Sequence, residues 1–360
     1  MASTLNLKQF RQEGCLSYAV IDVATRVVAM IDPNHELLED YRAFLAERGL
    51  KLVLALDTHL HADHFSGTQA LRQEYGCEIG MAAGTPSVRV TRKLVDGDRL
   101  AVGGLSLKVL ATPGHTPDSL CFHLDLAGQG SVPGLVFTGD TLFIGSTGRT
   151  DFPGADPLAQ WRSLHEILGA LPGGTLVYPG HDYNGLLFST IDVEKRRNPH
   201  WLLASKELFV DLKERERIPN PGDEIRKRIE FNRRAESGTG PAQSHGAATA
   251  CGTAGASTER VTVISVDKYK AKLAESAPGT IFLDVREPDE FAGERIPGTT
   301  NLPLSDLGLR LPELAMASRI YLSCQSGGRS TRAAQTLAYL GIHQAVDVSG
   351  GLTAWKKAGL

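Results

Sequence analysis

This 360-residue sequence has little cysteine, no excess of one charge and no long apolar run. Five cysteines, an odd number, do not suggest a disulfide scaffold, so we expect a reducing, cytoplasmic setting. The 38 Lys and Arg residues against 41 Asp and Glu leave a net charge of −3, which favours neither a nucleic-acid nor a membrane partner. Apolar stretches such as residues 52–56 are too short to span a bilayer, and residues 1–10 lack the pattern of a secretory signal.

Large apolar residues are also missing from residues 236–259, which contain no Leu, Ile, Val, Phe, Tyr or Trp and are rich in Gly, Ala, Ser and Thr. A segment of this composition buries too little apolar surface to order itself, so it predicts a flexible linker. The alternative is one long surface loop, which is uncommon inside a compact domain. We therefore predict a first domain at 1–235, a linker at 236–259 and a second domain at 260–360.

In the first domain, short apolar runs of strand character repeatedly end in loops that carry His or Asp. Four such runs precede candidate metal ligands: residues 52–56 before the segment 57–64, 105–110 before His115, 135–137 before Asp140, and 175–178 before His181. Helical periodicity lies between them, for instance at residues 67–75 and 158–171. Strand ends that each deliver a His or Asp predict a site built along one rim of a sheet.

The first of these loops places three imidazoles and one carboxylate within six residues, at His59, His61, Asp63 and His64. With 11 His and 41 acidic residues in the chain, chance would give this pattern about once in a thousand sequences. The alternative is a solvated polar turn whose histidines cap a following helix. Because His115, Asp140 and His181 offer further ligands and no cysteine competes in these loops, the pattern favours a site for Zn, Mn or Fe.

Four motifs carry a family resemblance: THLHADH (58–64), TPGHT (112–116), TGDTL (138–142) and YPGHDY (178–183). They resemble the metallo-β-lactamase family, whose fold is an αββα sandwich. Within that superfamily, GRTDF (148–152) resembles the persulfide dioxygenases, and the resemblance covers about residues 5–235. It implies that the first domain oxidises glutathione persulfide with O₂ and water to sulfite and glutathione.

The resemblance also implies a metal site with one non-haem Fe(II) per chain. The positions that match the family's iron ligands are His59, His115 and Asp140. Two imidazoles and one carboxylate leave three positions open on iron, enough for a substrate sulfur and O₂. Four more residues would surround an unfilled second metal site, and whether they ever bind a metal stays open: His61, Asp63, His64 and His181.

Two further residues are candidate substrate contacts. Arg149 follows the metal-ligand segment and could hold a carboxylate of glutathione through a bidentate pair. Its alternative is an ordinary ion pair with Asp151 or another acid. Tyr183 is a similar candidate, with a buried structural role as its alternative. We expect both residues to bind substrate.

A different reaction class fits the same ligands. Hydroxyacylglutathione hydrolases of the glyoxalase II type, from the same superfamily, use all seven ligand positions to bind two metals and hydrolyse a thioester. All seven residues are present here, so their identity does not exclude the hydrolase. Residues 182–235 are short for that hydrolase's glutathione-binding extension, so we favour the dioxygenase. A metal- or redox-sensing binding module is a third alternative, which O₂ uptake would separate from both enzymes.

In the second domain, residues 319–323 have the pattern of a strand, followed by the loop 324–329 and an amphipathic helix at 330–340. This arrangement aims backbone N–H groups and a helix dipole at one anion, so Cys324 would be held as a reactive thiolate. The other cysteines are expected to be unreactive, three in apolar strand-like runs and one in the linker: Cys15, Cys77, Cys121 and Cys251.

This part resembles the rhodanese family through DVRE (284–287), IPG (296–298) and SGGLTAW (349–355), which implies an α/β domain with a parallel sheet. Arg295 precedes IPG where rhodaneses often carry His, with little expected effect on catalysis. The six-residue loop from Cys324 to Arg329 has the sulfurtransferase length, one residue shorter than in related phosphatases. The resemblance implies that Cys324 passes sulfur between thiosulfate and glutathione, and that Arg329 helps bind the anionic donor.

Together these interpretations predict a dioxygenase fused to a sulfurtransferase. Its expected small-molecule partners are glutathione persulfide, glutathione, O₂, thiosulfate and sulfite. Neither a nucleic acid nor a membrane is expected as a partner. The sequence leaves the oligomeric state open, a homodimer included.

Overall fold

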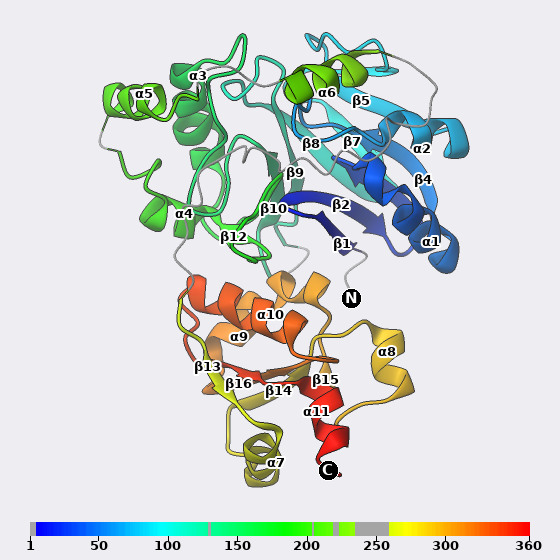
Figure 1. The fold of residues 1–360 in the computed structure, drawn as a ribbon, viewed down its shortest axis with the longest axis vertical. Helices are drawn as coiled ribbons and strands as arrows, with labels where there is room; N and C mark the ends of the chain where they lie inside the picture. The colour runs from blue at the N-terminus through cyan, green and yellow to red at the C-terminus, as the bar shows by residue number, and fades with distance from the viewer. Residues whose placement is uncertain (1–4, 129–130, 204, 219–222, 235–258) are drawn as a thin grey trace. The chain divides into compact units, whose positions relative to one another are not determined.

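Two mixed β-sheets form the first part of the chain in the computed structural model, which describes residues 5–128, 131–203, 205–218, 223–234 and 259–360. The first sheet has the strand order β1-β2-β3-β4-β5-β6 (Figure 1). Its strands are β1 (Leu5–Gln12), β2 (Cys15–Asp22), β3 (Val27–Ile31), β4 (Lys51–Leu56), β5 (Glu78–Ala82) and β6 (Arg92–Leu94). The first three are antiparallel neighbours, whereas β3 to β6 run parallel.

In the second sheet β11-β10-β9-β8-β7 are neighbours in that order. These strands are β7 (Arg99–Val102), β8 (Leu105–Ala111), β9 (Leu120–Asp125), β10 (Gly134–Gly139) and β11 (Leu176–Pro179). Their pairs are antiparallel except β10 with β11, which is parallel. A two-residue strand, β12 (Ser189–Thr190), comes directly before α4 (Ile191–Arg197).

Helices cover the outer faces of both sheets. The remaining helices of this part are α1 (Leu38–Arg48), α2 (Thr68–Tyr75), α3 (Pro157–Arg162), α5 (Lys206–Arg215) and α6 (Asp223–Arg233). Tyr41 of α1 and Leu71 of α2 pack in one apolar core with the first sheet, and Phe209 of α5 packs in a second core with Val136 and Val177 of the second sheet. Between the sheets, the Tyr18 ring lies 5.2 Å from the Phe137 ring. The predicted αββα sandwich is confirmed.

The helix predicted over 158–171 is divided into three pieces. Asp156 caps α3 by accepting hydrogen bonds from the amides of Leu158 and Ala159. The chain then continues as a π-helical turn (Ser163–Ile167) and a 3-10 turn (Leu168–Ala170). The apolar periodicity is kept through these changes, so Leu164 and Leu168 both reach the core.

The second part is built on a five-stranded, all-parallel sheet with the order β13-β17-β16-β14-β15. Its strands are β13 (Thr262–Ile264), β14 (Thr280–Asp284), β15 (Thr300–Asn301), β16 (Arg319–Ser323) and β17 (Ala345–Val348). Its helices are α7 (Val266–Glu275), α8 (Pro288–Gly293), α9 (Leu311–Met316), α10 (Gly328–Tyr339) and α11 (Gly351–Lys357). Aromatic rings fill its core, where Phe282 and Tyr321 stack at 5.2 Å. The predicted α/β class is confirmed.

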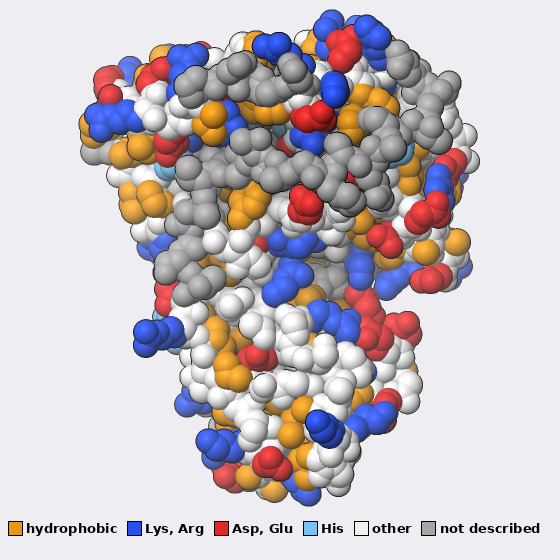
Figure 2. All heavy atoms as spheres, viewed as in Figure 1, with side chains coloured by type: hydrophobic (Ala, Val, Ile, Leu, Met, Phe, Trp, Pro, Cys, Tyr) orange, Lys and Arg blue, Asp and Glu red, His pale blue; other side chains and the backbone are white. Residues whose placement is uncertain are grey.

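The described residues divide into two compact units, one with the two-sheet sandwich and one with the parallel sheet. The predicted linker at 236–259 lies outside the described residues except for Glu259, so its flexibility and the domain boundaries stay predictions. No described helix is both long and apolar enough to cross a bilayer. Charged side chains of both signs are interspersed over the face shown in Figure 2, in line with the small net charge.

Candidate metal centre and cysteine loop

The candidate metal ligands follow the ends of four strands, as the sequence predicts. The loop after β4 carries the histidine motif, and β8, β10 and β11 lead into His115, Asp140 and His181. The sheets therefore supply rigid supports for side chains on short loops. His59, His115 and Asp140 are each 2% exposed, and one ligand atom from each lies within 4.8 Å of the others.

Hydrogen bonds orient the three side chains. His59 Nδ1 lies 3.0 Å from the Thr58 hydroxyl, and His115 Nδ1 donates to the backbone carbonyl of Arg149 at 2.7 Å. This leaves both Nε2 atoms as acceptors. His59 Nε2 and Asp140 Oδ2 are buried and have no hydrogen-bond partner among the described residues. Buried polar atoms are normally paired, so their isolation points to a ligand held between them.

The charges of the three groups suit a cation. Burial lowers the pKa of His59 well below its ordinary value and also lowers the pKa of His115, which keeps both imidazoles neutral. Burial alone would raise the pKa of Asp140, but the neighbouring His181 and His115 lower it below its ordinary value. Neutral imidazoles and an ionised carboxylate are the forms that bind a metal.

His181 joins this triad to the remaining candidates by hydrogen bonds. Its Nδ1 is 2.8 Å from Asp140 Oδ1, and its Nε2 is 3.0 Å from Asp63 Oδ2. The same Asp63 oxygen accepts from His64 Nδ1 at 2.7 Å. Asp63, His64 and His181 of the predicted second metal site are thus joined by hydrogen bonds. To ligate a second ion, His181 would have to break its hydrogen bond to one of the two carboxylates.

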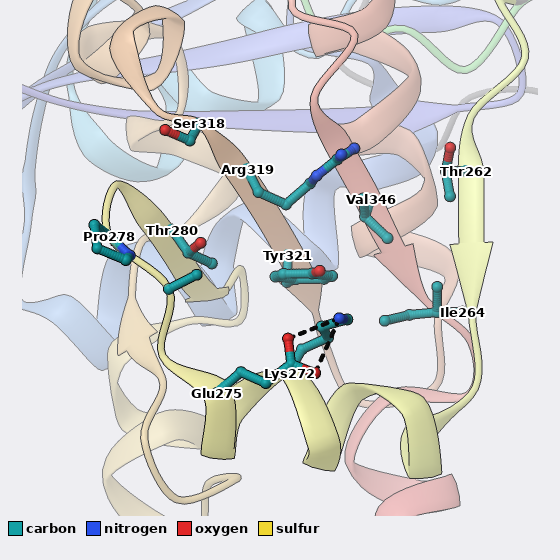
Figure 3. Close-up of a pocket in the computed structure, with 11 residues that line it drawn as sticks. Thr262, Ile264, Lys272, Glu275, Pro278, Thr280, Ser318, Arg319, Tyr321 and Val346 are labelled. Atoms are coloured by element: carbon teal, nitrogen blue, oxygen red, sulfur yellow. Dashed lines mark hydrogen bonds and ion pairs between the residues drawn. The ribbon is translucent and has the colours of Figure 1, made fainter.

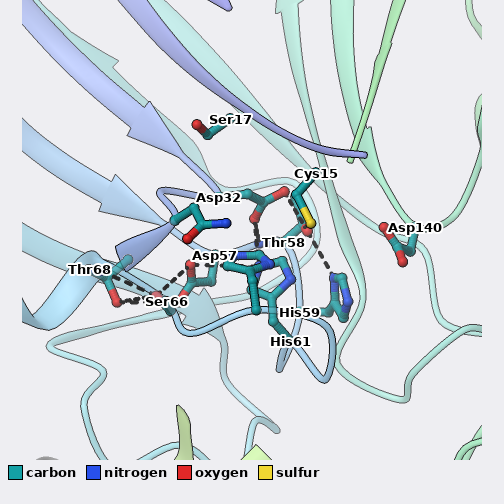
Figure 4. A network of polar contacts seen from close by, with 12 residues as sticks. Cys15, Ser17, Asp32, Asp57, Thr58, His59, His61, Ser66, Thr68 and Asp140 are labelled. Atoms are coloured by element: carbon teal, nitrogen blue, oxygen red, sulfur yellow. Dashed lines mark hydrogen bonds and ion pairs between the residues drawn. The ribbon is translucent and has the colours of Figure 1, made fainter. Parts of the chain in front are cut away.

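His61 of the histidine loop contacts two carboxylates, those of Asp32 and Asp57 (Figure 4). Its Nε2 lies 3.1 Å from Asp32 Oδ1 and 3.7 Å from Asp57 Oδ1. Thr58 donates from its amide and hydroxyl to Asp32, and the Ser66 hydroxyl donates to Asp57. Burial alone would lower the pKa of His61, but Asp32 and Asp63 raise it well above its ordinary value. His61 therefore braces the loop as an imidazolium.

Cys15 lies in more polar surroundings than the sequence indicated, and its expected lack of reactivity stays a prediction. We expected an unreactive thiol in an apolar strand, but Cys15 is half-buried and its Sγ donates to Asp63 Oδ2 at 3.3 Å. It opens β2, beside His181. The side of the strand that faces the metal centre cannot be recognised from a run of apolar residues. The prediction holds better for Cys77 and Cys121, whose thiol pKa values burial raises to about 11 and about 12.

Asn232 is a second residue that the sequence did not indicate. Its side-chain amide donates to the carbonyls of His61 (3.0 Å) and His64 (2.9 Å), and its carbonyl accepts from the Ser66 amide (2.9 Å). Asn232 is 4% exposed. The end of α6 thereby fixes both ends of the histidine loop, and no local motif could have revealed a contact across about 170 positions.

The two predicted substrate contacts, Arg149 and Tyr183, differ in burial and in their partners. Arg149 uses Nε and Nη2 in a bidentate pair with Asp151, at 2.9 and 2.6 Å, which is the alternative that the sequence left open. Its Nη1 is outside that pair. Tyr183 is 38% exposed, and its ring is stacked on the His181 ring, so it is not a buried structural tyrosine. Substrate binding by either residue stays a prediction.

In the second unit, Cys324 follows β16 and is 2% exposed. The Gly327 amide donates to its Sγ at 3.1 Å, and α10 begins directly afterwards at Gly328. Gly351, with a φ of +51°, packs so closely that a Cβ there would lie 2.0 Å from the Cys324 carbonyl oxygen. The glycine-rich segment before α11 therefore shapes the loop, which a side chain at position 351 would displace.

Arg329 ends the loop, and both its terminal nitrogens contact Glu290, at 2.5 and 2.7 Å. About one third of the Arg329 side chain stays exposed. Arg286, from the DVRE motif, is buried against Asp284 and reaches Gln325 of the loop at 3.1 Å. The motif thus supports the loop from the neighbouring strand.

A groove of about 470 Å³ lies at the opposite end of the parallel sheet (Figure 3). It is lined by Arg319 at the start of β16, whereas Cys324 follows the end of the same strand. Lys272 at its edge is paired with Glu275. This groove is therefore separate from the cysteine loop.

Comparison with known families agrees with this division. Residues 14–181 match the metallo-beta-lactamase superfamily, and residues 265–358 match the rhodanese-like domain. The persulfide dioxygenase ETHE1 of Mus musculus is 34% identical over 222 residues, which cover 61% of this chain and 84% of that protein. The chain belongs to the persulfide dioxygenase family. With its rhodanese-like domain, it combines two families of sulfur enzymes.

Solved structures support the same assignment. The crystal structure of ETHE1 from Myxococcus xanthus is 36% identical, covers 63% of this chain and 97% of that one, and has a TM-score of 0.59. A metallo-beta-lactamase from Staphylococcus aureus, at 22% identity and a TM-score of 0.59, shows the fold alone while covering 96% of this chain and all of that one.

A hydroxyacylglutathione hydrolase of Brucella anthropi is 38% identical over 202 residues, 53% of this chain and 72% of that protein.

Proposed function

We propose that the first domain of this persulfide dioxygenase family member oxidises glutathione persulfide, and that the rhodanese-like domain makes that persulfide from thiosulfate and glutathione. The observation that supports the first activity best is the buried pair of unpartnered ligand atoms, His59 Nε2 and Asp140 Oδ2, with His115 beside them. The free cysteines among the described residues support a reducing, cytoplasmic setting.

Fe(II) is the metal we propose for His59, His115 and Asp140. Two neutral imidazoles and one carboxylate on one face are the ligand set of non-haem iron oxygenases. When bound, Fe(II) supplies the redox chemistry that lets a persulfide react with O₂. One ion per chain is expected, because Asp63, His64 and His181 are already bonded to each other.

The protein's own groups hold the ligands in place. The Thr58 hydroxyl and the Arg149 carbonyl fix which nitrogen each imidazole presents, and His181 orients Asp140. A cavity of about 430 Å³ adjoins His115, and its walls include Leu60 and Phe152. In the balanced reaction, glutathione persulfide, O₂ and water give glutathione, sulfite and two protons.

In the second domain, Cys324 is the proposed nucleophile. Its thiolate attacks the outer sulfur of thiosulfate, the S–S bond breaks, and sulfite leaves with the electron pair. The thiolate of glutathione then attacks the outer sulfur of the Cys324 persulfide, which forms glutathione persulfide and restores Cys324. The Gly327 amide stabilises the anionic sulfur, and Arg329 binds the anionic donor beside Glu290.

The metal content tests the first activity against the hydrolase that the same ligands allow. Purified protein should contain about one iron per chain and should consume O₂ with glutathione persulfide. Two tightly bound zinc ions together with thioesterase activity would favour the hydrolase instead. Protein that shows neither activity would support a binding module.

Replacing Arg149 by Ala should raise the KM for glutathione persulfide roughly threefold to tenfold, with the iron content unchanged. The effect is modest because Asp151 occupies the bidentate edge, which leaves Nη1 for a substrate carboxylate. His115 is oriented by the backbone carbonyl at position 149, which the variant keeps. Loss of iron from Arg149→Ala, with recovery in Arg149→Lys, would show that the side chain is structural.

A further inference from the structure

The arginine that ends the cysteine loop already has a carboxylate as its partner. Arg329 donates from Nη1 and Nη2 to the two oxygens of Glu290, at 2.5 and 2.7 Å. The pair occupies the end of the guanidinium, whose two parallel N–H groups suit the oxygens of an oxyanion. About one third of each side chain is exposed, so a ligand can reach the pair. A sulfur donor with anionic oxygens therefore has to compete with Glu290 for Arg329.

Glu290 is held in place by the helix that carries it. It is the third residue of α8, and its Oε2 accepts a hydrogen bond from the Glu287 amide at 3.1 Å, which forms a capping box. The hydrogen bonds from Arg329 lower the pKa of Glu290 below its ordinary value, so the carboxylate is charged at neutral pH. Glu290 therefore presents a fixed negative charge to Arg329.

A second arginine beside the loop, Arg286, is neutralised in a similar way. It is 2% exposed, donates from Nε and Nη2 to Asp284 at 2.8–3.0 Å, and reaches the Glu294 carbonyl at 2.6 Å. This pair is buried, so it is harder to break than the partly exposed pair of Arg329. A donor that approaches Cys324 thus meets two arginines with carboxylate partners, and Arg329 is the one whose partner is easier to replace.

We propose that Glu290 is a specificity-determining residue of the cysteine loop, which competes with the sulfur donor for Arg329 and so disfavours donors with two negative charges. This rests on the proposed function, in which Cys324 takes sulfur from an anionic donor. Hydrogen bonds to Glu290 and the nearby charge of a Cys324 thiolate raise the pKa of Arg329, which places the guanidinium within the field of the reacting sulfur. A singly charged donor gains less from Arg329 and therefore loses less to Glu290.

Two sulfur donors that differ in charge test the proposal. Thiosulfate carries two negative charges and methanethiosulfonate carries one. Each gives its outer sulfur to the Cys324 thiolate as the S–S bond breaks, and sulfite or methanesulfinate leaves with the electron pair. Glu290→Gln should raise kcat/KM for thiosulfate about fivefold, through KM, and that for methanethiosulfonate at most about twofold. Gln also suits the third position of a capping box, so α8 should keep its start.

Glu294→Gln is the matched control. Glu294 is the C-cap residue of α8, and its side chain pairs with Lys356 at 3.0 Å, where both side chains are more than half exposed. The variant removes the same charge from the same helix without touching Arg329, so it should leave the ratio of the two donors unchanged. In an Arg329→Met background, Glu290→Gln should also leave that ratio unchanged, because the competition has gone.

Alkylation of the full chain gives a readout that needs no sulfur transfer. Glu290→Gln should raise the rate of Cys324 with iodoacetate about threefold relative to its rate with neutral iodoacetamide, measured by mass spectrometry of the Cys324 peptide. An unchanged donor ratio in Glu290→Gln, an equal change in Glu294→Gln, or the same change in the Arg329→Met background would overturn the proposal.

The two readouts also separate this proposal from the proposed reaction. If the alkylation ratio responds as expected but thiosulfate gives no sulfur transfer, the competition for Arg329 stands and the proposed sulfurtransferase activity fails. If sulfur transfer is normal but Glu290→Gln changes neither ratio, the activity stands and the competition fails.

Discussion

Replacing Cys324 by Ser should abolish O₂ uptake driven by thiosulfate plus glutathione, by at least about a thousandfold, and leave uptake driven by glutathione persulfide near the wild-type rate. A serine hydroxyl cannot form a persulfide, so the first domain would receive no substrate. The substitution is nearly isosteric, and Ser can still accept the hydrogen bond from the Gly327 amide. Cys324 and the metal ligands belong to separate compact units, so the two effects should be independent.

The two substrates serve as controls for each other, because one variant should respond to them in opposite ways. Sulfite gives a second readout. Thiosulfate should yield two sulfite ions for each O₂, since one leaves Cys324 and one comes from the dioxygenase, whereas glutathione persulfide should yield one. Unchanged thiosulfate-driven uptake in Cys324→Ser would show that sulfur enters elsewhere. Loss of direct persulfide oxidation would show that the sites depend on each other.

Replacing Asp140 by Ala should remove the iron and reduce O₂ uptake with glutathione persulfide at least about a hundredfold, because only two protein ligands would remain. Sulfur transfer from thiosulfate by the second domain should be unaffected, which checks that the second domain is folded and that the loss is confined to the first. The measurements are iron per chain, O₂ uptake and sulfurtransferase activity on the same preparation.

Asp140 also accepts from His181 Nδ1, so its removal could loosen the loop in addition to losing the ligand. Asp140→Asn keeps the shape and an acceptor for His181 but lacks the charge, and it should likewise bind iron poorly. Full iron content and activity in both variants would mean that Asp140 is not a ligand. Retained iron with lost activity would assign Asp140 to a later step than metal binding.

The parts of the site that could be predicted from sequence are those whose signal is local. The histidine loop, His115, Asp140 and Cys324 each lie directly after an apolar strand, and their spacing alone indicates a shared rim or an anion-binding loop. The predicted ends of helices and strands were less exact where a strand is followed directly by the N-cap of a helix. The apolar pattern of residues 261–266 predicts a single strand, but β13 ends at Ile264, Ser265 caps α7 and Val266 is already helical.

What could not be predicted depends on contacts between distant segments. Asn232 and Arg233 lie in a charged, weakly amphipathic stretch, and only the fold brings them to the histidine loop and the cavity. Arg149 shows a different limit. Its side chain pairs with Asp151, and its backbone carbonyl accepts a hydrogen bond from His115. The motif GRTDF (148–152) is compatible with a contact through either group, so the sequence could not show which part of Arg149 contacts the site.

The anchored end of α6 has a mechanical consequence for a chain that carries a second domain. Arg89 is buried and donates to the carbonyls of Phe231 and Arg234, and Asn232 holds the histidine loop between them. If the second domain moves on a flexible tether, any pull along the chain reaches Arg234 first. That load is borne by Arg89 and the segment around it before it can reach Asn232. On that condition the metal ligands would be insulated from tension, and a tether of a different length would leave their positions undisturbed.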